Sequence, residues 1–212
     1  LKISTFLWKN KRKNWYKMAK SEENQAFPYE IYCDMDGVLV DLFENGVYLE
    51  AKDPKLRKNL EKIIEMRWKW SKDHENPEIQ AALEWIRQLL GDNRSFWANL
   101  RPLPGILPLW TYLNSLGTVK VLSHPWDEAS AEGKIDWINH YLLPKPKNEH
   151  IFLPLDGKKE IWAQNNGKPC VLIDDFSMYT EKWEENGGIA ILHTSIHDTI
   201  QQLERLKGEN NE

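Results

Sequence analysis

The alternation of two kinds of segment constrains the fold of this chain more than any other feature. Segments with apolar residues at helical spacing lie between short apolar runs of strand character. Strands that alternate with helices are typical of parallel strands joined by crossover helices. The sequence therefore predicts an α/β fold with a doubly wound, Rossmann-like parallel sheet. The predicted strands are 30–34, 118–123, 149–153, 169–174 and 188–192, and the predicted helices are 104–116, 130–142, 158–166, 177–186 and 195–207.

Residues 43–100 interrupt this alternation. A doubly wound sheet needs a single helix between its first two strands, whereas this stretch carries two long helical patterns. We predict that 43–100 is a small helical cap inserted after the first strand, and that 29–42 and 101–212 form the core. The apolar positions of the two patterns are Leu56, Leu60, Ile63 and Ile64 in the first and Ile79, Leu83, Ile86 and Leu90 in the second.

The net charge of −4 hides a basic N-terminus. Residues 1–20 hold seven of the 28 Lys and Arg residues and no acid, so the rest of the chain carries 21 bases against 32 acids. An acidic body argues against a broad surface that binds phosphate backbones. We interpret 1–28 as a basic arm without fixed structure. The alternative is that this arm, and no other part of the chain, contacts nucleic acid.

The remaining composition predicts a soluble, cytoplasmic protein without a membrane partner. Cys33 and Cys170 lie in apolar runs, where a buried free thiol in a reducing compartment is the expected state. No apolar stretch approaches the ~18 residues of a membrane span, and the charged N-terminus does not look like a signal peptide. No pattern indicates an oligomeric state.

Two carboxylates, Asp34 and Asp36, follow the first apolar run and precede Gly37 in the stretch EIYCDMDGVLVDL. Two acids this close repel one another unless a cation compensates for their charge. A solvated Asp-Gly turn is the simpler explanation of this stretch taken alone.

Three later segments favour a functional explanation. In a parallel sheet the carboxyl ends of the strands share one edge, where open α/β folds bind their ligands. Polar residues gather at the ends of further predicted strands and at the start of one helix. They are Ser123 and His124 in VLSHP, Lys158 and Lys159 in DGKKEIW, and Asp174 and Asp175 in VLIDDF.

Phosphoryl transfer is the chemistry that suits such an edge. A carboxylate that attacks phosphorus must overcome repulsion from the phosphate oxygens, so a hard divalent cation and an ammonium group are required. Mg²⁺ would supply the first and a lysine the second. One acid would carry the phosphoryl group as an aspartyl-phosphate, and its neighbour would protonate the leaving oxygen and later activate water.

In order and spacing, the segments DMDG, VLS, a lysine and LIDD resemble the motifs of the haloacid dehalogenase-like phosphatase superfamily. The resemblance covers about residues 29–207. It implies that Asp34 is the nucleophile and Asp36 the general acid and base. It also implies a phosphate site formed by the Ser123 side chain and the backbone N–H of His124.

The same resemblance implies a Mg²⁺ site. Its ligands would be the side chains of Asp34 and Asp174 and the backbone carbonyl of Asp36, with Asp175 nearby.

The lysine of the motif is open between two neighbours. Lys159, in KEIWA, has the spacing of the lysine-led helix of the family, and we favour it over Lys158, which lies one residue nearer to the preceding strand. Lys134, in EGKIDWINHYL, is a further candidate for the phosphate pocket because similar segments occur in related proteins. A surface lysine on an amphipathic helix is the alternative for Lys134.

Within the superfamily, the helical insert, DMDGVLVDL and FWANLRPLPGI resemble the 5'(3')-deoxyribonucleotidase branch. This resemblance implies a nucleoside monophosphate substrate. The insert offers Phe43, Phe96 and Trp97 as apolar surface for a base. The chain departs from the branch at Leu42, where those enzymes place an aromatic residue against the base.

Four other functions are alternatives to this one. A phosphatase for polynucleotide ends, or for other small molecules, would use the same motifs, and the first of these would give the basic arm a role. A receiver-type signalling domain carries its lysine after the acidic strands, whereas Lys159 precedes LIDD, and it has no cap. A catalytically silent phosphate-binding scaffold has no support, because every chemical position is filled.

Overall fold

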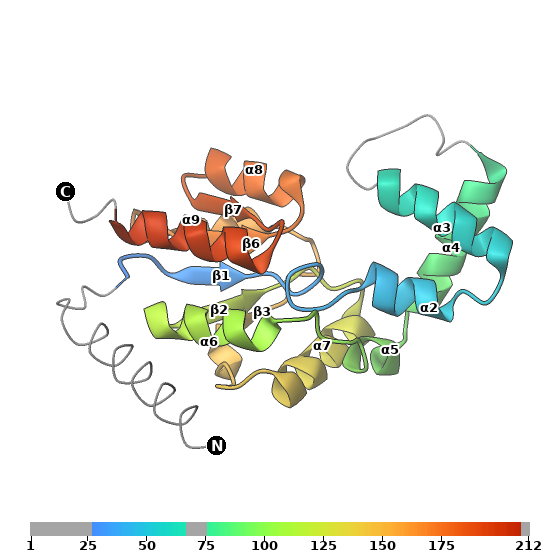
Figure 1. Cartoon of the computed structure of the whole chain (residues 1–212), viewed down its shortest axis with the longest axis horizontal. Helices are drawn as coiled ribbons and strands as arrows, with labels where there is room; N and C mark the ends of the chain where they lie inside the picture. Colours follow the sequence, from blue (N-terminus) through green and yellow to red (C-terminus); the bar gives the residue numbers. More distant parts are fainter. Residues whose placement is uncertain (1–26, 67–75, 209–212) are drawn as a thin grey trace, which may run out of the picture.

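A computed structural model of the protein describes residues 27–66 and 76–208 (Figure 1). Its centre is a five-stranded sheet in the order β3-β2-β1-β6-β7, and each strand runs parallel to its neighbours. The first strand, β1, lies in the middle of this sheet. β2 and β3 follow toward one edge, and β6 and β7 follow toward the other edge. The predicted fold class is confirmed. The strands are β1 (Ile31–Cys33), β2 (Val119–Leu122), β3 (Ile151–Phe152), β6 (Val171–Asp174) and β7 (Ile189–Leu192).

Helices cover both faces of the sheet because side chains alternate along each strand. Ile31 and Cys33 of β1 belong to a buried cluster with α6 (Ile106–Leu116) and α9 (Ile196–Gly208). Tyr32, between them, points to the opposite face, where it packs on Trp183. That face is covered by α8 (Ser177–Glu185), while α7 (Glu128–Tyr141) follows β2. The short η3 (Asn148–His150) precedes β3.

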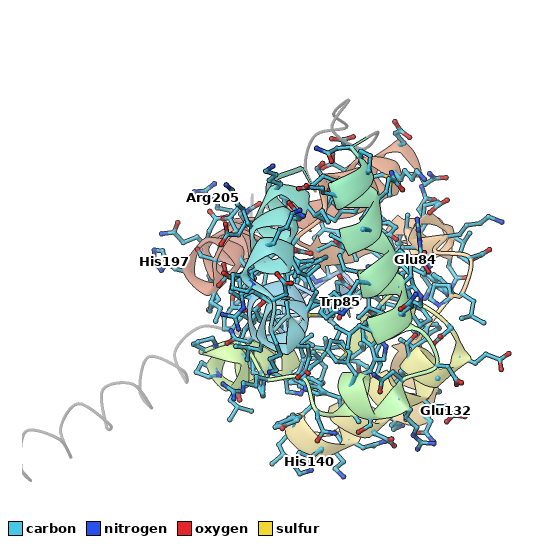
Figure 2. All side chains as sticks on the ribbon, turned by 90° about the vertical axis from the view of Figure 1, so that its right-hand side faces the viewer. Glu84, Trp85, Glu132, His140, His197 and Arg205 are labelled. Carbon is cyan, nitrogen blue, oxygen red and sulfur yellow. The ribbon has the colours of Figure 1, made fainter. Side chains whose placement is uncertain are left out.

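The long stretch between β1 and β2 is largely helical. Figure 1 shows α3 and α4 beyond the carboxyl ends of the strands, and Figure 2 places Trp85 between these two helices. The helices α3 and α4 match the two helical patterns predicted from the sequence. The elements are the π-helical η1 (Phe43–Val47), α2 (Tyr48–Glu50), α3 (Pro54–Met66), α4 (Pro77–Leu90) and α5 (Arg94–Ala98).

The entry and the exit of this stretch lie side by side. The N–H of Leu103 donates to the carbonyl of Leu39 at 2.9 Å, and Val40 forms a bridge with Pro102. A segment whose two ends meet can be inserted without disturbing the sheet. The division of the chain into a core and a cap stays a prediction, and the basic arm lies outside the described residues apart from its last two positions.

The helix α5 packs against α7 of the core. Gly133 makes the approach possible, because a Cβ at this position would lie 2.4 Å from the carbonyl oxygen of Arg94 and 2.6 Å from Cβ of Trp97. The side chain of Arg94 binds Glu132 and Asp136 of α7 at 2.6 and 2.7 Å. α5 therefore packs more extensively on α7 than on α4.

The predicted helix at 158–166 is wrong. The structure has a single 3-10 turn, η4 (Lys159–Trp162), followed by a hairpin of β4 (Gln164–Asn165) and β5 (Lys168–Pro169). Asn166 and Gly167 have φ angles of +51° and +75°, as the tight turn of a two-residue hairpin requires. The Asn-Gly pair in the sequence was the signal for this hairpin.

Two further observations bear on the sequence predictions. Cys33 and Cys170 are buried free thiols, as expected. Among the residues that the structure describes, no helix has both the length and the apolar character needed to span a bilayer.

Candidate active site

The register of the sheet brings the acidic residues together. Cys33 of β1 pairs with Ile173 of β6, so Asp34 and Asp174 follow on neighbouring strands, and the N–H of Asp34 donates to the carbonyl of Ile173. Together with Asp175 they form a cluster in which one carboxylate oxygen of each lies within 4.8 Å of the others. All three residues are buried.

The glycine of the first motif has a steric role. Gly37 has a φ of +79°, and a Cβ there would lie 1.9 Å from Oδ2 of Asp175. Any other residue would be strained in this conformation and would displace the carboxylate. Gly37 therefore lets the DMDG segment lie directly against Asp175.

Lys159 lies among these acids. Its side chain is only 1% exposed, and Nζ lies 2.6 Å from Oδ2 of Asp174 and 2.9 Å from Oδ1 of Asp34. The contact with Asp174 is a hydrogen bond, whereas the contact with Oδ1 of Asp34 lacks hydrogen-bond alignment. Nζ also lies 4.4 Å from the centre of the Tyr179 ring.

The electrostatics of this cluster follow from burial and proximity. Burial, together with the charge of Asp34, raises the pKa of Asp174 to about 7. Burial acts to lower the pKa of Lys159, but the carboxylates of Asp34 and Asp174 outweigh it, so the net shift is upward. Lys159 is therefore a permanent cation in a group of acids.

The structure separates the two neighbouring lysines. Lys158 lies on the surface with 63% of its side chain exposed and pairs with Asp156 at 3.1 Å. Within the described residues, Lys158 forms no ion pair with Asp34 or Asp174, so the phosphate-binding role that the sequence leaves open for it has no support in the geometry.

A second buried lysine lies on the other side of the first motif. Lys134 of α7 is fully buried, and its Nζ donates to Oδ2 of Asp36 at 2.5 Å and to Oγ of Ser123 at 3.1 Å. The ring of Trp97 lies behind Nζ, 4.8 Å away at its centre. Lys134 is thus no surface lysine, and it joins three residues from different parts of the sequence.

His124 follows Ser123 at the end of β2. Its ring Nδ1 is 2.8 Å from the hydroxyl of Tyr179. Its backbone N–H donates no hydrogen bond within the described parts of the chain. The predicted phosphate donor is therefore available.

Many of these groups line a cavity of about 550 Å³, namely Asp34, Asp36, Ser123, His124, Lys159, Asp175 and Tyr179. Leu42, the last residue before the insert, lines this cavity, and the insert contributes much of the rest of the wall, including Phe43. Phe96 is not among the lining residues and borders a separate polar cavity of about 430 Å³. Trp97 lines the catalytic cavity but is only 2% exposed.

Several lining residues were missed by the sequence reasoning. Trp126 is 49% exposed. It lies near the end of α4, as its Nε1 would be 3.9 Å from a Cβ built at Gly91. Its position three residues after Ser123, in the loop beyond a strand end, was the signal that could have found it. Arg87, Phe176 and Tyr179 also line the cavity.

With this geometry in view, known proteins were compared with the chain. A family model described as "5' nucleotidase, deoxy (Pyrimidine), cytosolic type C protein" matches residues 29–208. The chain belongs to this family. It is therefore a phosphatase of the haloacid dehalogenase-like superfamily, which confirms the resemblance found in the sequence motifs.

Solved structures share the fold at low sequence identity. A hydrolase from Streptococcus pneumoniae TIGR4 has 15% identity and a TM-score of 0.51, covering 83% of this chain and 98% of its own. A HAD family hydrolase from Deinococcus radiodurans R1, with bound phosphate and sodium, has 16% identity and a TM-score of 0.50, covering 84% and 88%. No curated protein sequence matches the chain.

Proposed function

We propose that the protein hydrolyses nucleoside monophosphates through an aspartyl-phosphate on Asp34, with Mg²⁺ as cofactor. The observation that carries this proposal is that Asp34, Asp36 and Lys159 line a cavity whose other walls are largely apolar. The polar residues suit a phosphate, and the apolar walls suit a base.

The reaction has two steps on this chain. A carboxylate oxygen of Asp34 bonds to phosphorus while the bond between phosphorus and the nucleoside oxygen breaks. Asp36 gives a proton to that oxygen, so the nucleoside leaves as an alcohol. Water then attacks the phosphorus and returns a proton to Asp36, which releases inorganic phosphate and restores the Asp34 carboxylate.

A divalent cation fits the acidic cluster. Three carboxylates, from Asp34, Asp174 and Asp175, face the single ammonium of Lys159. Oδ1 of Asp34 is buried without a hydrogen-bond partner in the described residues. These residues, with the backbone carbonyl of Asp36, would hold Mg²⁺, whose preferred ligands are oxygens. When bound, it would neutralise phosphate charge that otherwise repels the nucleophile.

Four groups would hold the phosphate. Lys159 and Lys134 supply positive charge on opposite sides of the first motif, and Ser123 supplies a hydroxyl. The unpaired N–H of His124 is the fourth donor. A buried site with such donors holds a dianion more tightly than an exposed one, because water does not compete.

The cavity walls support a planar, apolar leaving group. Trp126 from the core and Phe43 from the insert both line the cavity, and Trp126 retains much exposed ring surface. Stacking of a base on an aromatic ring contributes roughly 1 to 3 kcal/mol. A sugar phosphate offers no such surface. We also propose that pyrimidine deoxynucleotides are preferred among these substrates. This preference rests on the description of the family alone.

The test is phosphate release from a panel of substrates in the presence of Mg²⁺. The panel contains 5'- and 3'-monophosphates of deoxyribonucleosides and ribonucleosides, sugar phosphates, and oligonucleotides with a terminal phosphate. We expect the nucleoside monophosphates to give the highest kcat/KM. Faster turnover of sugar phosphates or of oligonucleotide ends would contradict the proposal.

A substitution in the cavity wall tests the contribution of the wall to substrate binding separately from that of the phosphate site. Trp126→Ala should raise KM for nucleoside monophosphates about 10-fold, since one stacking contact is lost. KM for p-nitrophenyl phosphate should change less. Leu143→Ala, an exposed apolar residue outside the lining of the cavity, is the control and should change neither value.

A further inference from the structure

Trp97 is held in place from two sides. Its Nε1 donates to the carbonyl of Leu90, the last residue of α4, at 2.9 Å. Its Cβ lies so close to α7 that a Cβ at Gly133 would be 2.6 Å away. The ring therefore has a fixed position between the end of α4 and the helix that carries Lys134.

The ring of Trp97 is a neighbour that Lys134 needs. A fully buried ammonium group has lost its water, and its three N–H donors require partners. Asp36 and Ser123 accept two hydrogen bonds, and the Trp97 ring lies 4.8 Å from Nζ. An aromatic face attracts a desolvated cation, and among aromatic residues tryptophan does so best.

Lys134 in turn holds the carboxylate of Asp36 by one oxygen. Oδ2 accepts the hydrogen bond from Nζ, while Oδ1 is buried without a partner in the described residues. Asp36 lines the cavity. The lysine thus fixes the orientation of the carboxylate to which the proposed function assigns protonation of the leaving oxygen.

We infer that Trp97 is a positioning residue for the proton donor of the reaction, rather than a wall that reads the base. The contacts run from α4 through the Trp97 ring to Lys134 and then to Asp36. This inference rests on the proposed function, because it assigns Asp36 the protonation of the leaving oxygen.

The leaving group distinguishes this role from a structural one. A nucleoside leaves as an alkoxide unless it is protonated, so its release depends on a well-placed proton donor. p-Nitrophenol leaves without help. A displaced Lys134 would weaken phosphate binding for both substrates alike. A displaced Asp36 would slow the nucleotide more than p-nitrophenyl phosphate, because only the nucleotide needs a proton on its leaving oxygen.

The experiment compares kcat and KM for a nucleoside monophosphate and p-nitrophenyl phosphate in four proteins. They are the wild type, Trp97→Leu, Trp97→Phe and Trp110→Leu. Trp97→Leu removes the ring, and Trp97→Phe keeps a ring but loses the hydrogen bond to Leu90. Trp110 is the matched control, because it is equally buried and its Nε1 also donates to a carbonyl, that of Pro144.

We expect Trp97→Leu to lower the nucleotide kcat about 10-fold or more relative to that of p-nitrophenyl phosphate, a part of the roughly 10²- to 10⁴-fold effect of a proton donor. Trp97→Phe should retain most of the wild-type ratio, and Trp110→Leu all of it. Trp97→Met, whose unbranched side chain adapts better to the vacated space, takes the place of Trp97→Leu if the latter does not fold.

Two outcomes would overturn the inference. An equal loss on both substrates would make Trp97 a structural residue, and a raised nucleotide KM with unchanged kcat would make it a base-binding wall. Both leave the proposed function intact, since the wild type is active in each. A wild type without activity on either substrate would instead remove the proposed function.

Discussion

Two cavities lie at the carboxyl edge of the same sheet, and the proposed reaction site is in the smaller one. The cavity beside β7 and the start of α9 has a volume of about 830 Å³, against about 550 Å³ for the cavity that contains Asp34. Asp175 lines both. Among the described residues, it is the only Asp, Glu, Lys or Arg that lines the larger cavity, whereas Asp34, Asp36 and Lys159 all line the smaller one.

The difference shows what marks a reaction site in this fold. Burying a charge costs several kcal/mol unless a partner compensates, so groups of buried charges are retained where chemistry needs them. The smaller cavity has such groups around Lys159 and Lys134, while the larger has neutral polar groups such as His193 and Ser195. Volume alone would have selected the wrong cavity.

The largest expected effect is at the nucleophile. Asp34→Asn should fold and lose nearly all phosphatase activity, because an amide oxygen does not form the acyl-phosphate. The matched change in the larger cavity, His193→Gln, should leave kcat and KM unchanged. Phosphate release assays on both variants test whether the reaction takes place in the smaller cavity. Substantial turnover by folded Asp34→Asn would contradict this assignment.

The second effect is at the proton donor. Asp36→Asn should slow hydrolysis of a nucleoside monophosphate by roughly 10²- to 10⁴-fold. The loss with p-nitrophenyl phosphate should be smaller, since that leaving group needs no proton. If steady-state assays gave equal losses, Asp36 would have only a structural or metal-binding role.

The third effect concerns the metal. Asp174→Asn should raise the Mg²⁺ concentration for half-maximal activity by about 10- to 100-fold, the range usual when a partner in a metal site is lost. The measurement is a Mg²⁺ titration of activity after treatment with a chelator. Wild-type activity that survives chelation would contradict the proposed cation site.

The smallest effect lies in the larger cavity and concerns stability. Burial lowers the pKa of His193, against a smaller opposing influence of Asp198, and its Nδ1 pairs with the hydroxyl of Thr199 at 2.8 Å. A lowered folded-state pKa means that neutral His193 stabilises the fold above its unfolded pKa of about 6.5. That contribution is lost as the pH falls through the folded-state pKa.

His193→Gln should therefore lose less stability than the wild type between pH 7 and pH 5. Thermal unfolding at several pH values measures this difference. Identical pH profiles for the two proteins would mean that His193 titrates normally in the fold.

Much of the site followed from local sequence. Asp34, Ser123 and Asp174 could be placed on one edge because each ends or follows a strand, and parallel strands end together. The failure at 158–166 was also local, because the Asn-Gly turn signal was outweighed by an apparent helical period. There the sequence held the answer and the reasoning missed it.

By itself, then, the sequence determined which strands end in polar residues. Those residues in turn indicated phosphoryl transfer as the class of reaction. Only the tertiary structure decided between Lys158 and Lys159, because a one-residue shift along a 3-10 turn sends one side chain into solvent and the other among the acids. It also decided the partners of Lys134, which lies 98 residues from Asp36 along the chain. The contact of Lys134 with the Trp97 ring depends on how closely α5 and α7 pack at Gly133, and no local pattern encodes that distance.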